Sequence, residues 1–387
     1  MSMNPKTYCP LPFTQISTEN DGSYRLCCHS NATVKNDDGS TSYLQDTPVS
    51  EVWNNNFYKT IRSQMNNNER PSVCNGCYKL EDKGQVSYRE RYNRQLPNND
   101  NTMPTHLELK VGNLCNLKCV MCYPGASSLH QQEVAEFVAD GIDPPNAFSQ
   151  FETTDQFKKA KPQQYADNLN LDDCIRLTMS GGEPLVNKTT DLILDRCIEE
   201  DRCEQIELEV ITNLTVLNPA MLNKIKKFPR SKLLVSWDHV YEKANYIRYP
   251  MDYKKFIDNL YQVQSANIDI NVSSCITIFN VFDLKQIFDA WQLNGIKLVR
   301  LELVYFPLYF NIEYLTDTQL DLVRKQIELI EQTEYSFMSD DIRLKLESIK
   351  QLTSIHDDAV LAERKRVIDL YDKKRNTNCA TLFPFIS

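Results

Sequence analysis

The sequence lacks long apolar runs and an excess of positive charge. No stretch approaches the roughly 18 consecutive apolar residues that a membrane helix needs. Met1 to Lys6 are not followed by the apolar run of a signal peptide. The net charge of −9 argues against broad electrostatic binding to nucleic acid or to an anionic membrane surface. We therefore expect a cytoplasmic protein with no nucleic-acid or membrane partner.

Cysteine, in contrast, is abundant and unevenly spread. The chain has 13 cysteines, and eight of them precede residue 123, seven of these in two close pairs and a triplet. An odd number in a long chain of cytosolic character is poorly explained by a set of disulfides. The clustering instead predicts that thiolates bind metal.

The order of apolar patterns predicts an α/β fold. After residue 100, short β-rich runs alternate with helical patterns, which is typical of a parallel sheet with covering helices. Six such units predict a partial (β/α)6 TIM-like barrel. The expected strands are 105–111, 175–180, 206–211, 233–237, 268–278 and 298–304. The expected helices between them are 188–200, 219–227, 252–264 and 281–293.

The two ends of the chain have their own patterns. Residues 13–27 predict a hairpin about Asp21-Gly22, and residues 52–65 and 79–94 predict two helices. From residue 316 onward the pattern is helical, ending in an apolar tail. We therefore expect a small cysteine-rich N-terminal module (1–100), the barrel (101–310) and a helical C-terminal extension (311–387). The polar stretch 98–101 marks the first boundary.

Three cysteines directly follow the first expected barrel strand. Cys115, Cys119 and Cys122 are spaced so that one short loop brings three sulfurs to a corner of an iron–sulfur cluster. Such clusters usually have four thiolate ligands, so three ligands leave one iron open to a small molecule. A partial zinc site is the alternative, although structural zinc usually takes four protein ligands.

The triplet resembles the Cys-x3-Cys-x-aromatic-Cys signature of the radical S-adenosylmethionine (SAM) superfamily. Met121 takes the place of the aromatic residue and offers an apolar surface there. The likeness extends over residues 105–304 and includes three further motifs near strand ends. These are Gly181-Gly182-Glu183-Pro184, the Thr-Asn turn at Asn213 (with Leu214 in place of a glycine), and Ser236-Trp237-Asp238.

The resemblance implies which residues bind the cofactors. Cys115, Cys119 and Cys122 would be catalytic and hold a [4Fe-4S] cluster that binds SAM. The expected SAM-binding residues are Met121, Gly181, Gly182, Glu183, Asn213, Ser236, Asp238 and Arg248. Glu183 would accept hydrogen bonds from the SAM amine, and Ser236 and Arg248 would contact its carboxylate. Asp238 would lie near the ribose or the substrate. From the residues alone, Asp238 and Arg248 are equally consistent with a surface ion pair.

The N-terminal cysteines resemble the opening of the SPASM motif, which binds auxiliary iron–sulfur clusters in a radical SAM subgroup. Cys9, Cys27, Cys74 and Cys77 would hold one cluster, with [4Fe-4S] as the expected type, as in the shorter "twitch" version. A module placed before the barrel is similar to twitch-containing radical SAM proteins of phages. Structural zinc at the same four thiols is the alternative. Cys28 is a second candidate for the place of Cys27, and His29 is a further candidate ligand.

The function implied by the resemblance is reductive cleavage of SAM to a 5′-deoxyadenosyl radical that abstracts hydrogen from a substrate. We expect an oxidoreductase that acts on a peptide or protein and receives electrons from an external one-electron reductase such as flavodoxin or ferredoxin. A small polar metabolite or a nucleotide is the alternative substrate. A non-catalytic zinc-binding interaction protein is the alternative of another class.

Cys275 lies on the fifth expected strand. If it pointed into the barrel, it could donate a hydrogen atom to a substrate radical. A buried packing role is the alternative. The sequence also leaves open whether the auxiliary cluster accepts an electron or binds the substrate.

Overall fold

The computed structural model describes residues 6–30, 32–96, 102–148 and 161–386. The first five residues and the predicted boundary stretch 98–101 lie outside these ranges. The chain divides into two compact units. Unit 1 comprises Met1–Leu114, Thr154–Val210 and Asn218–Ser231, and unit 2 comprises Cys115–Thr153, Ile211–Leu217 and Lys232–Ser387. The division runs along strands β5 (Glu207–Thr212) and β6 (Ser231–Ser236), each of which belongs in part to both units.

An eight-stranded sheet has the order β2-β1-β3-β4-β5-β6-β7-β8. Its other strands are β1 (Gln15–Thr18), β2 (Tyr24–Arg25), β3 (His106–Lys110), β4 (Arg176–Ser180), β7 (Asp269–Ile276) and β8 (Val299–Leu303). The pairs β3–β4, β4–β5, β6–β7 and β7–β8 are parallel. This order confirms the α/β class and the strand sequence of a partial (β/α)6 barrel, and all six predicted barrel strands are present.

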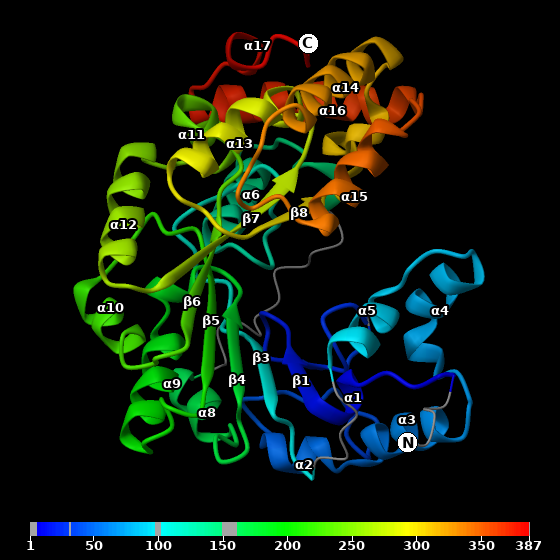
Figure 1. Ribbon diagram of the computed structural model, residues 1–387, viewed down its shortest axis with the longest axis vertical. Coiled ribbons are helices and arrows are strands. Elements are labelled where there is room, and N and C mark those ends of the chain that lie inside the picture. The colour runs from blue at the N-terminus through cyan, green and yellow to red at the C-terminus, as the bar shows by residue number, and fades with distance from the viewer. Residues whose placement is uncertain (1–5, 31, 97–101, 149–160, 387) are drawn as a thin grey trace. The chain divides into compact units, whose positions relative to one another are not determined.

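The predicted N-terminal hairpin is present but shorter than expected. Its first arm begins as the short helix α1 (Leu11–Thr14), and β1 then pairs antiparallel with β2. β1 also pairs in parallel with β3, with Gln15 opposite His106, and Figure 1 shows β1, β3 and β4 side by side. The sequence did not predict that the N-terminal residues would extend the sheet of the barrel strands.

Two predicted helices are each divided in the structure. Residues 52–65 form α2 (Val49–Trp53) and α3 (Asn56–Asn66), because the Asn55 side chain caps α3 by accepting a hydrogen bond from Tyr58 N at 3.0 Å. Residues 79–94 form α4 (Asn75–Asp82) and α5 (Tyr88–Gln95). Between them, Gly84 has φ +74° and Ser87 begins α5 with a capping box.

The helices predicted at 188–200, 219–227, 252–264 and 281–293 and the helical pattern after residue 316 are confirmed, with small shifts at the helix ends. The sequence did not predict the helices Ser128–Ala139, Pro162–Asp167 and Tyr241–Ile247. Unit 1 contains α8 (Pro162–Asp167), α9 (Lys188–Glu199) and α10 (Pro219–Ile225). Unit 2 contains α6 (Ser128–Ala139), α11 (Tyr241–Ile247), α12 (Tyr253–Ser265), α13 (Leu284–Leu293), α14 (Asp317–Glu331), α15 (Asp340–Lys350), α16 (Asp358–Arg375) and α17 (Cys379–Leu382). The last four make up the helical C-terminal extension. Among the described helices, none combines the length and apolar character needed to cross a membrane.

The strands of unit 1 have one apolar and one polar face. Leu107, Leu177 and Leu208 occupy neighbouring strands in register and are fully buried. The alternate positions form what we call the polar face: Gln15, Ser17, His106, Glu108, Lys110, Arg176, Thr178, Ser180, Glu207 and Glu209. Barrel strands usually direct bulky apolar side chains inward. This face of the unit 1 strands is therefore unusually polar, although Gln15, Ser17 and Thr178 on it are buried.

A buried ion pair joins the end of α16 to α6 within unit 2. Arg375 donates to Glu133 through Nε at 3.1 Å and Nη2 at 2.6 Å. Lys118, inside the cysteine triplet, lies 2.7 Å from the same carboxylate. Burial opposes the charged carboxylate, but Arg375 and Lys118 outweigh it and lower the pKa of Glu133. The C-terminal extension is thereby tied to the loop that carries the triplet.

We expect Glu133→Gln to lower the free energy of unfolding by roughly 3 to 5 kcal/mol, because it leaves two cations without their carboxylate. Urea unfolding at pH 7 measures this. A carboxylate with a lowered pKa stabilises the fold above its unfolded pKa of about 4.3 and loses that stabilisation as pH falls through the folded pKa. The difference between wild type and variant should therefore shrink on acidification. A constant difference from pH 7 to pH 3 would contradict the assignment.

Candidate functional site

The loop that carries the triplet is fixed by backbone hydrogen bonds within unit 2. Lys118 N donates to Tyr249 O at 2.6 Å, and Val120 N donates to Ile247 O at 2.8 Å. His130, fully buried on α6, places Nε2 2.7 Å from the carbonyl oxygen of Cys119. A loop held at this many points presents its thiols in fixed positions.

The triplet thiols lie in a water-poor environment. Burial raises the pKa of Cys119 and of Cys122, and the charges of Cys119 and Cys115 raise the pKa of Cys122 further. Mutual repulsion of this kind requires that the three sulfurs be close together. Thiolates placed there need a compensating positive charge, which an iron–sulfur cluster supplies.

Arg248 and Asp238 form a buried ion pair beside the triplet. Arg248 Nε lies 2.7 Å from Asp238 Oδ2, with side-chain exposures of 10% and 1%. The alternative of a surface ion pair is therefore wrong. Arg248 Nη1 also lies 3.8 Å from the Cys119 sulfur. Burial disfavours the charged guanidinium, but Asp238 and Cys119 outweigh it and raise the pKa of Arg248.

Asn213 contributes an amide donor to the same group. Its Nδ2 lies 3.9 Å from the Cys115 sulfur and donates to Asn116 Oδ1 at 3.1 Å. Its Oδ1 accepts hydrogen bonds from Thr215 N at 2.9 Å and from Thr215 Oγ1 at 2.6 Å. The side chain is thus held from both ends and directed at a predicted cluster ligand.

The Gly-Gly-Glu-Pro motif lies in unit 1, on the residues that precede Cys115. Gly182 has φ +50°, and a Cβ atom there would overlap the Leu114 carbonyl oxygen. Glu183 N donates to Leu114 O at 2.8 Å, and Glu183 Oε1 accepts from Leu185 N at 3.0 Å. Glycine is therefore required by close approach of two loops. Glu183 is buried, with 1% exposure.

The positions of the other predicted SAM-binding residues say less about how SAM would be bound. Met121 is half-buried in the triplet loop, and Ser236 is half-buried at the end of β6, opposite Ser273. Gly181, with φ +82°, packs against Lys110 in unit 1. In unit 2 the structure thus brings together six predicted residues: Cys115, Cys119, Cys122, Asn213, Asp238 and Arg248.

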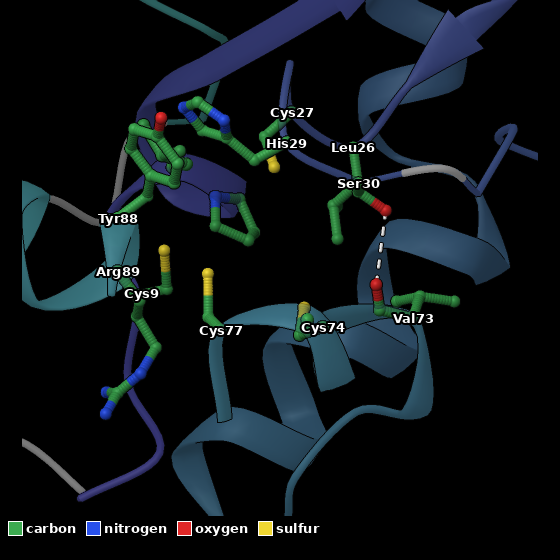
Figure 2. A pocket seen from close by; sticks show the side chains of 13 residues that line it. Cys9, Leu26, Cys27, His29, Ser30, Val73, Cys74, Cys77, Tyr88 and Arg89 are labelled. Atoms are coloured by element: carbon green, nitrogen blue, oxygen red, sulfur yellow. Dashed lines mark hydrogen bonds between the residues drawn. The ribbon is translucent and has the colours of Figure 1, made fainter. Parts of the chain in front are cut away.

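A second site lies wholly in unit 1. Cys9, Cys27, Cys74 and Cys77 line one pocket, which contains about 460 Å³ of empty space and is partly open to solvent. Figure 2 shows the four sulfurs arranged around a common space, with His29, Tyr88 and Arg89 at its edge. The structure thus gathers thiols that are up to 68 residues apart in sequence.

The surroundings of the four thiols disfavour free thiolates but offer groups that stabilise ligated ones. Burial raises the pKa of Cys27 to about 11 and of Cys74 to about 12, and the charge of Cys77 adds to both shifts. The backbone N–H groups of His29 and Ser30 are hydrogen-bonded to Cys27. Arg89 lowers the pKa of Cys74 in part. Such N–H groups and cations stabilise cluster sulfurs.

The neighbouring residues Cys28 and His29 take different positions. Cys28 does not line the pocket and is instead hydrogen-bonded to Glu108. His29 lines the pocket, but its ring is stacked on Tyr88 with centroids 3.4 Å apart. Cys27 is therefore the better-placed ligand of the two cysteines.

Both thiol sets fit the chemistry of an iron–sulfur cluster, although the side chains of neither set already have the geometry of metal ligands. Within the described ranges, no three Cys, His, Asp or Glu side chains stand in ready metal-binding geometry. The fit rests on the donor set: neighbouring thiols, of which Cys9 and Cys119 are buried and the others half-buried, with N–H and guanidinium groups nearby.

Sequence reasoning missed several residues at these sites. Asn116 and Arg89 gave no signal, because their roles depend on partners distant in sequence.

Cys275 lies on the half-exposed side of β7, and its N–H donates to Asp238 Oδ1 at 2.8 Å. Among the cysteines outside both thiol sets, Cys174, Cys197 and Cys379 are buried and Cys203 is half-buried.

Comparison with known proteins gives two family matches. Residues 109–290 match the model of the radical SAM superfamily, and residues 9–78 match the iron–sulfur cluster-binding SPASM domain. An uncharacterized protein of Methanocaldococcus jannaschii is 28% identical over 206 residues, covering 51% of this chain and 62% of that protein. The chain therefore spans less than two thirds of this relative.

Solved structures give weaker likenesses. The structure of anSMEcpe with bound AdoMet and the Cp18Cys peptide has a TM-score of 0.40 and 14% identity, covering 60% of this chain and 63% of that one. SuiB of Streptococcus suis bound to its precursor peptide SuiA has a TM-score of 0.34 and 13% identity, covering 84% and 53%. Neither likeness is strong enough to assign a fold or a substrate.

The family matches decide between the interpretations of the two sites. A radical SAM domain implies a [4Fe-4S] cluster that binds SAM, and a SPASM domain implies an auxiliary iron–sulfur cluster. The zinc alternatives and the non-catalytic protein are thereby not supported. Residues 109–290 thus match a radical SAM domain, and the match to a SPASM domain at residues 9–78 precedes it in the chain.

Proposed function

We propose that Cys115, Cys119 and Cys122 hold the SAM-binding cluster and that the resulting radical acts on a peptide or protein. The observation that carries the first part is the buried group in unit 2. There Arg248 and Asn213 direct N–H groups at two of the three thiols. A cation and an amide beside ligand sulfurs suit a site that binds a zwitterionic sulfonium compound.

The protein's own residues bind and orient SAM, and they exclude water from the site. Arg248, balanced by Asp238, offers positive charge to the SAM carboxylate. A cluster held by Cys115, Cys119 and Cys122 would supply the one electron that cleaves the carbon–sulfur bond of SAM to methionine and a 5′-deoxyadenosyl radical, which would take a hydrogen atom from the substrate. Burial of Cys119 and Cys122 keeps water from this chemistry.

The second set of thiols supports a role in electron transfer. We assign Cys9, Cys27, Cys74 and Cys77 to the auxiliary cluster, with [4Fe-4S] as its type, and assign to it the acceptance of an electron from the substrate radical. An external one-electron reductase of the flavodoxin or ferredoxin type would reduce the enzyme. We also propose that domain boundaries near residues 100 and 310 separate the cysteine-rich module, the barrel and the C-terminal extension.

The polar face supports a peptide as the substrate. It spreads hydrogen-bonding side chains over four neighbouring strands, which suits a chain with repeated amide groups better than a compact metabolite. Glu108 is one of the carboxylates of this face. It accepts hydrogen bonds from Gln15 and Ser17 and is hydrogen-bonded to Cys28, and among the described residues no cation lies within ion-pair distance of it. Glu108 is therefore available to an N–H group of the substrate.

Reduced, cluster-loaded protein should cleave SAM to 5′-deoxyadenosine, and Cys119→Ala should abolish the product because the cluster loses a ligand. Chromatography with mass detection measures the nucleoside. Cys203→Ala, outside both thiol sets, is the matched control and should retain cleavage. Equal cleavage by wild type and Cys119→Ala would sink the proposal.

Cys27→Ser should lower the iron content by about four atoms per chain, because one ligand of the auxiliary cluster is lost. Cys28→Ser should leave it unchanged, because the Cys28 side chain bonds Glu108 rather than lining the pocket. Iron and sulfide analysis of anaerobically purified proteins measures both. Loss of iron from the Cys28 variant alone would reverse the assignment.

The substrate class can be tested by hydrogen transfer. Extract of source cells grown in D2O is separated into a peptide and protein fraction and a small-molecule fraction, and each is incubated with SAM and reduced enzyme. Deuterium should enter 5′-deoxyadenosine with the first fraction. Glu108→Gln should reduce this transfer about tenfold or more, because a hydrogen bond to a charged group is lost. Deuterium from the small-molecule fraction alone would favour a metabolite.

A further inference from the structure

Helices α4 and α5 carry positive charge next to the four-thiol pocket. From Arg70 to Arg94 the chain has six Lys and Arg residues against three Asp and Glu residues, a net charge of +3 in a chain of net −9. Two of these cations are neutralised: Arg70 pairs with Asp82 at 2.8 Å and Arg89 with Glu81 at 2.5 Å. The other four cations of this stretch therefore outnumber its one other carboxylate, Glu90.

Three of these cations project into solvent. Lys79, Lys83 and Arg94 are exposed, and among the described residues none of them is within ion-pair distance of a carboxylate. Lys79 and Lys83 are four residues apart at the end of α4, so they share one face of the helix. Unpaired cations on one face attract anionic partners over about one Debye length, roughly 10 Å at 0.1 M salt.

The same surface exposes apolar side chains. Leu80, Val86 and Tyr88 are 37%, 50% and 37% exposed. Leu80 lies between the two lysines in sequence, and Tyr88 begins α5. Exposed aromatic and aliphatic groups bordered by charge are typical of protein interfaces. We call Lys79, Leu80, Lys83, Val86, Tyr88 and Arg94 the docking surface.

The docking surface is continuous with the wall of the four-thiol pocket. Tyr88 belongs to both, since it lines the pocket and is partly exposed. Its ring is stacked on His29 with an interplanar angle of 12°, and Figure 2 shows this stacked pair at the edge of the thiol space. Gly76, which precedes Lys79 by one helical turn, lines the pocket as well. A partner seated here is separated from the thiols by a single layer of residues.

We propose that the docking surface binds a small acidic one-electron carrier protein that exchanges electrons with the auxiliary cluster. The oxidised carrier takes up the one electron that the auxiliary cluster accepts from the substrate radical, and the reverse transfer, from the reduced carrier to the oxidised cluster, reports on the same encounter. No bond forms or breaks in either direction. The proposal rests on the proposed function only in that Cys9, Cys27, Cys74 and Cys77 hold a cluster. Charge complementarity with exposed aromatic contact suits a weak, fast electron-transfer encounter.

The test uses an oxidised, fluorescently labelled flavodoxin for binding and the photoreduced form for stopped-flow kinetics with cluster-loaded full-length protein. Lys79→Glu combined with Lys83→Glu should weaken binding and slow cluster reduction at least about tenfold at low salt, because steering is lost. Wild type should slow as salt is raised. Lys79→Gln combined with Lys83→Gln should fall between the two. Reduced methyl viologen should reduce all proteins at equal rates.

Lys226→Glu combined with Lys227→Glu is the matched control. It changes the net charge equally, on two exposed residues that directly follow α10. This variant should bind and accept electrons nearly as wild type does. Equal slowing of both double variants, or no slowing in the α4 variant, would overturn the proposal. Absence of SAM cleavage with methyl viologen would instead count against the proposed function and leave the docking result standing.

Discussion

Thiolates gathered in a water-poor site repel one another and are poorly solvated, so they are stable only where positive charge compensates them. Both thiol sets of this chain meet that constraint with cations and N–H groups. Beside Cys119, the cation is Arg248, and its own buried charge is balanced by Asp238. Beside Cys74, the cation is Arg89. The buried Arg248–Asp238 pair is therefore a consequence of placing thiols there, and it leaves a cation facing the SAM-binding position.

Local pattern was sufficient to predict the barrel strands, because each contains a short apolar run bounded by polar residues. It was not sufficient to predict where helices stop. The helix expected over 52–65 is divided because Asn55 caps a new helix, and the one over 79–94 is divided at Gly84 and Ser87. In each case one or two residues outweigh an otherwise continuous amphipathic pattern.

Contacts between segments that are distant in sequence could not be predicted from local sequence patterns. The cluster ligands could be proposed from their spacing, but the burial of the Asp238–Arg248 pair could not. The pairing of Arg375 with Glu133, 242 residues away, had no sequence signal. Likewise, β1 continues the barrel strands in parallel with β3, so the N-terminal residues contribute Gln15 and other side chains to the polar face. These contacts decide which side chains are available for chemistry.

Leu214 shows how a departure from the expected motif is accommodated. It follows Asn213 and has φ +53°, where the resembling turn has glycine. This conformation costs a non-glycine residue about 1 to 2 kcal/mol. Thr212 Oγ1 accepts from Leu214 N at 2.9 Å, Asn259 Nδ2 donates to Leu214 O at 2.9 Å, and the leucine side chain is fully buried. Burial of a leucine contributes about 1.5 to 3 kcal/mol, which offsets the strain. The turn therefore keeps Asn213 directed at Cys115 without a glycine.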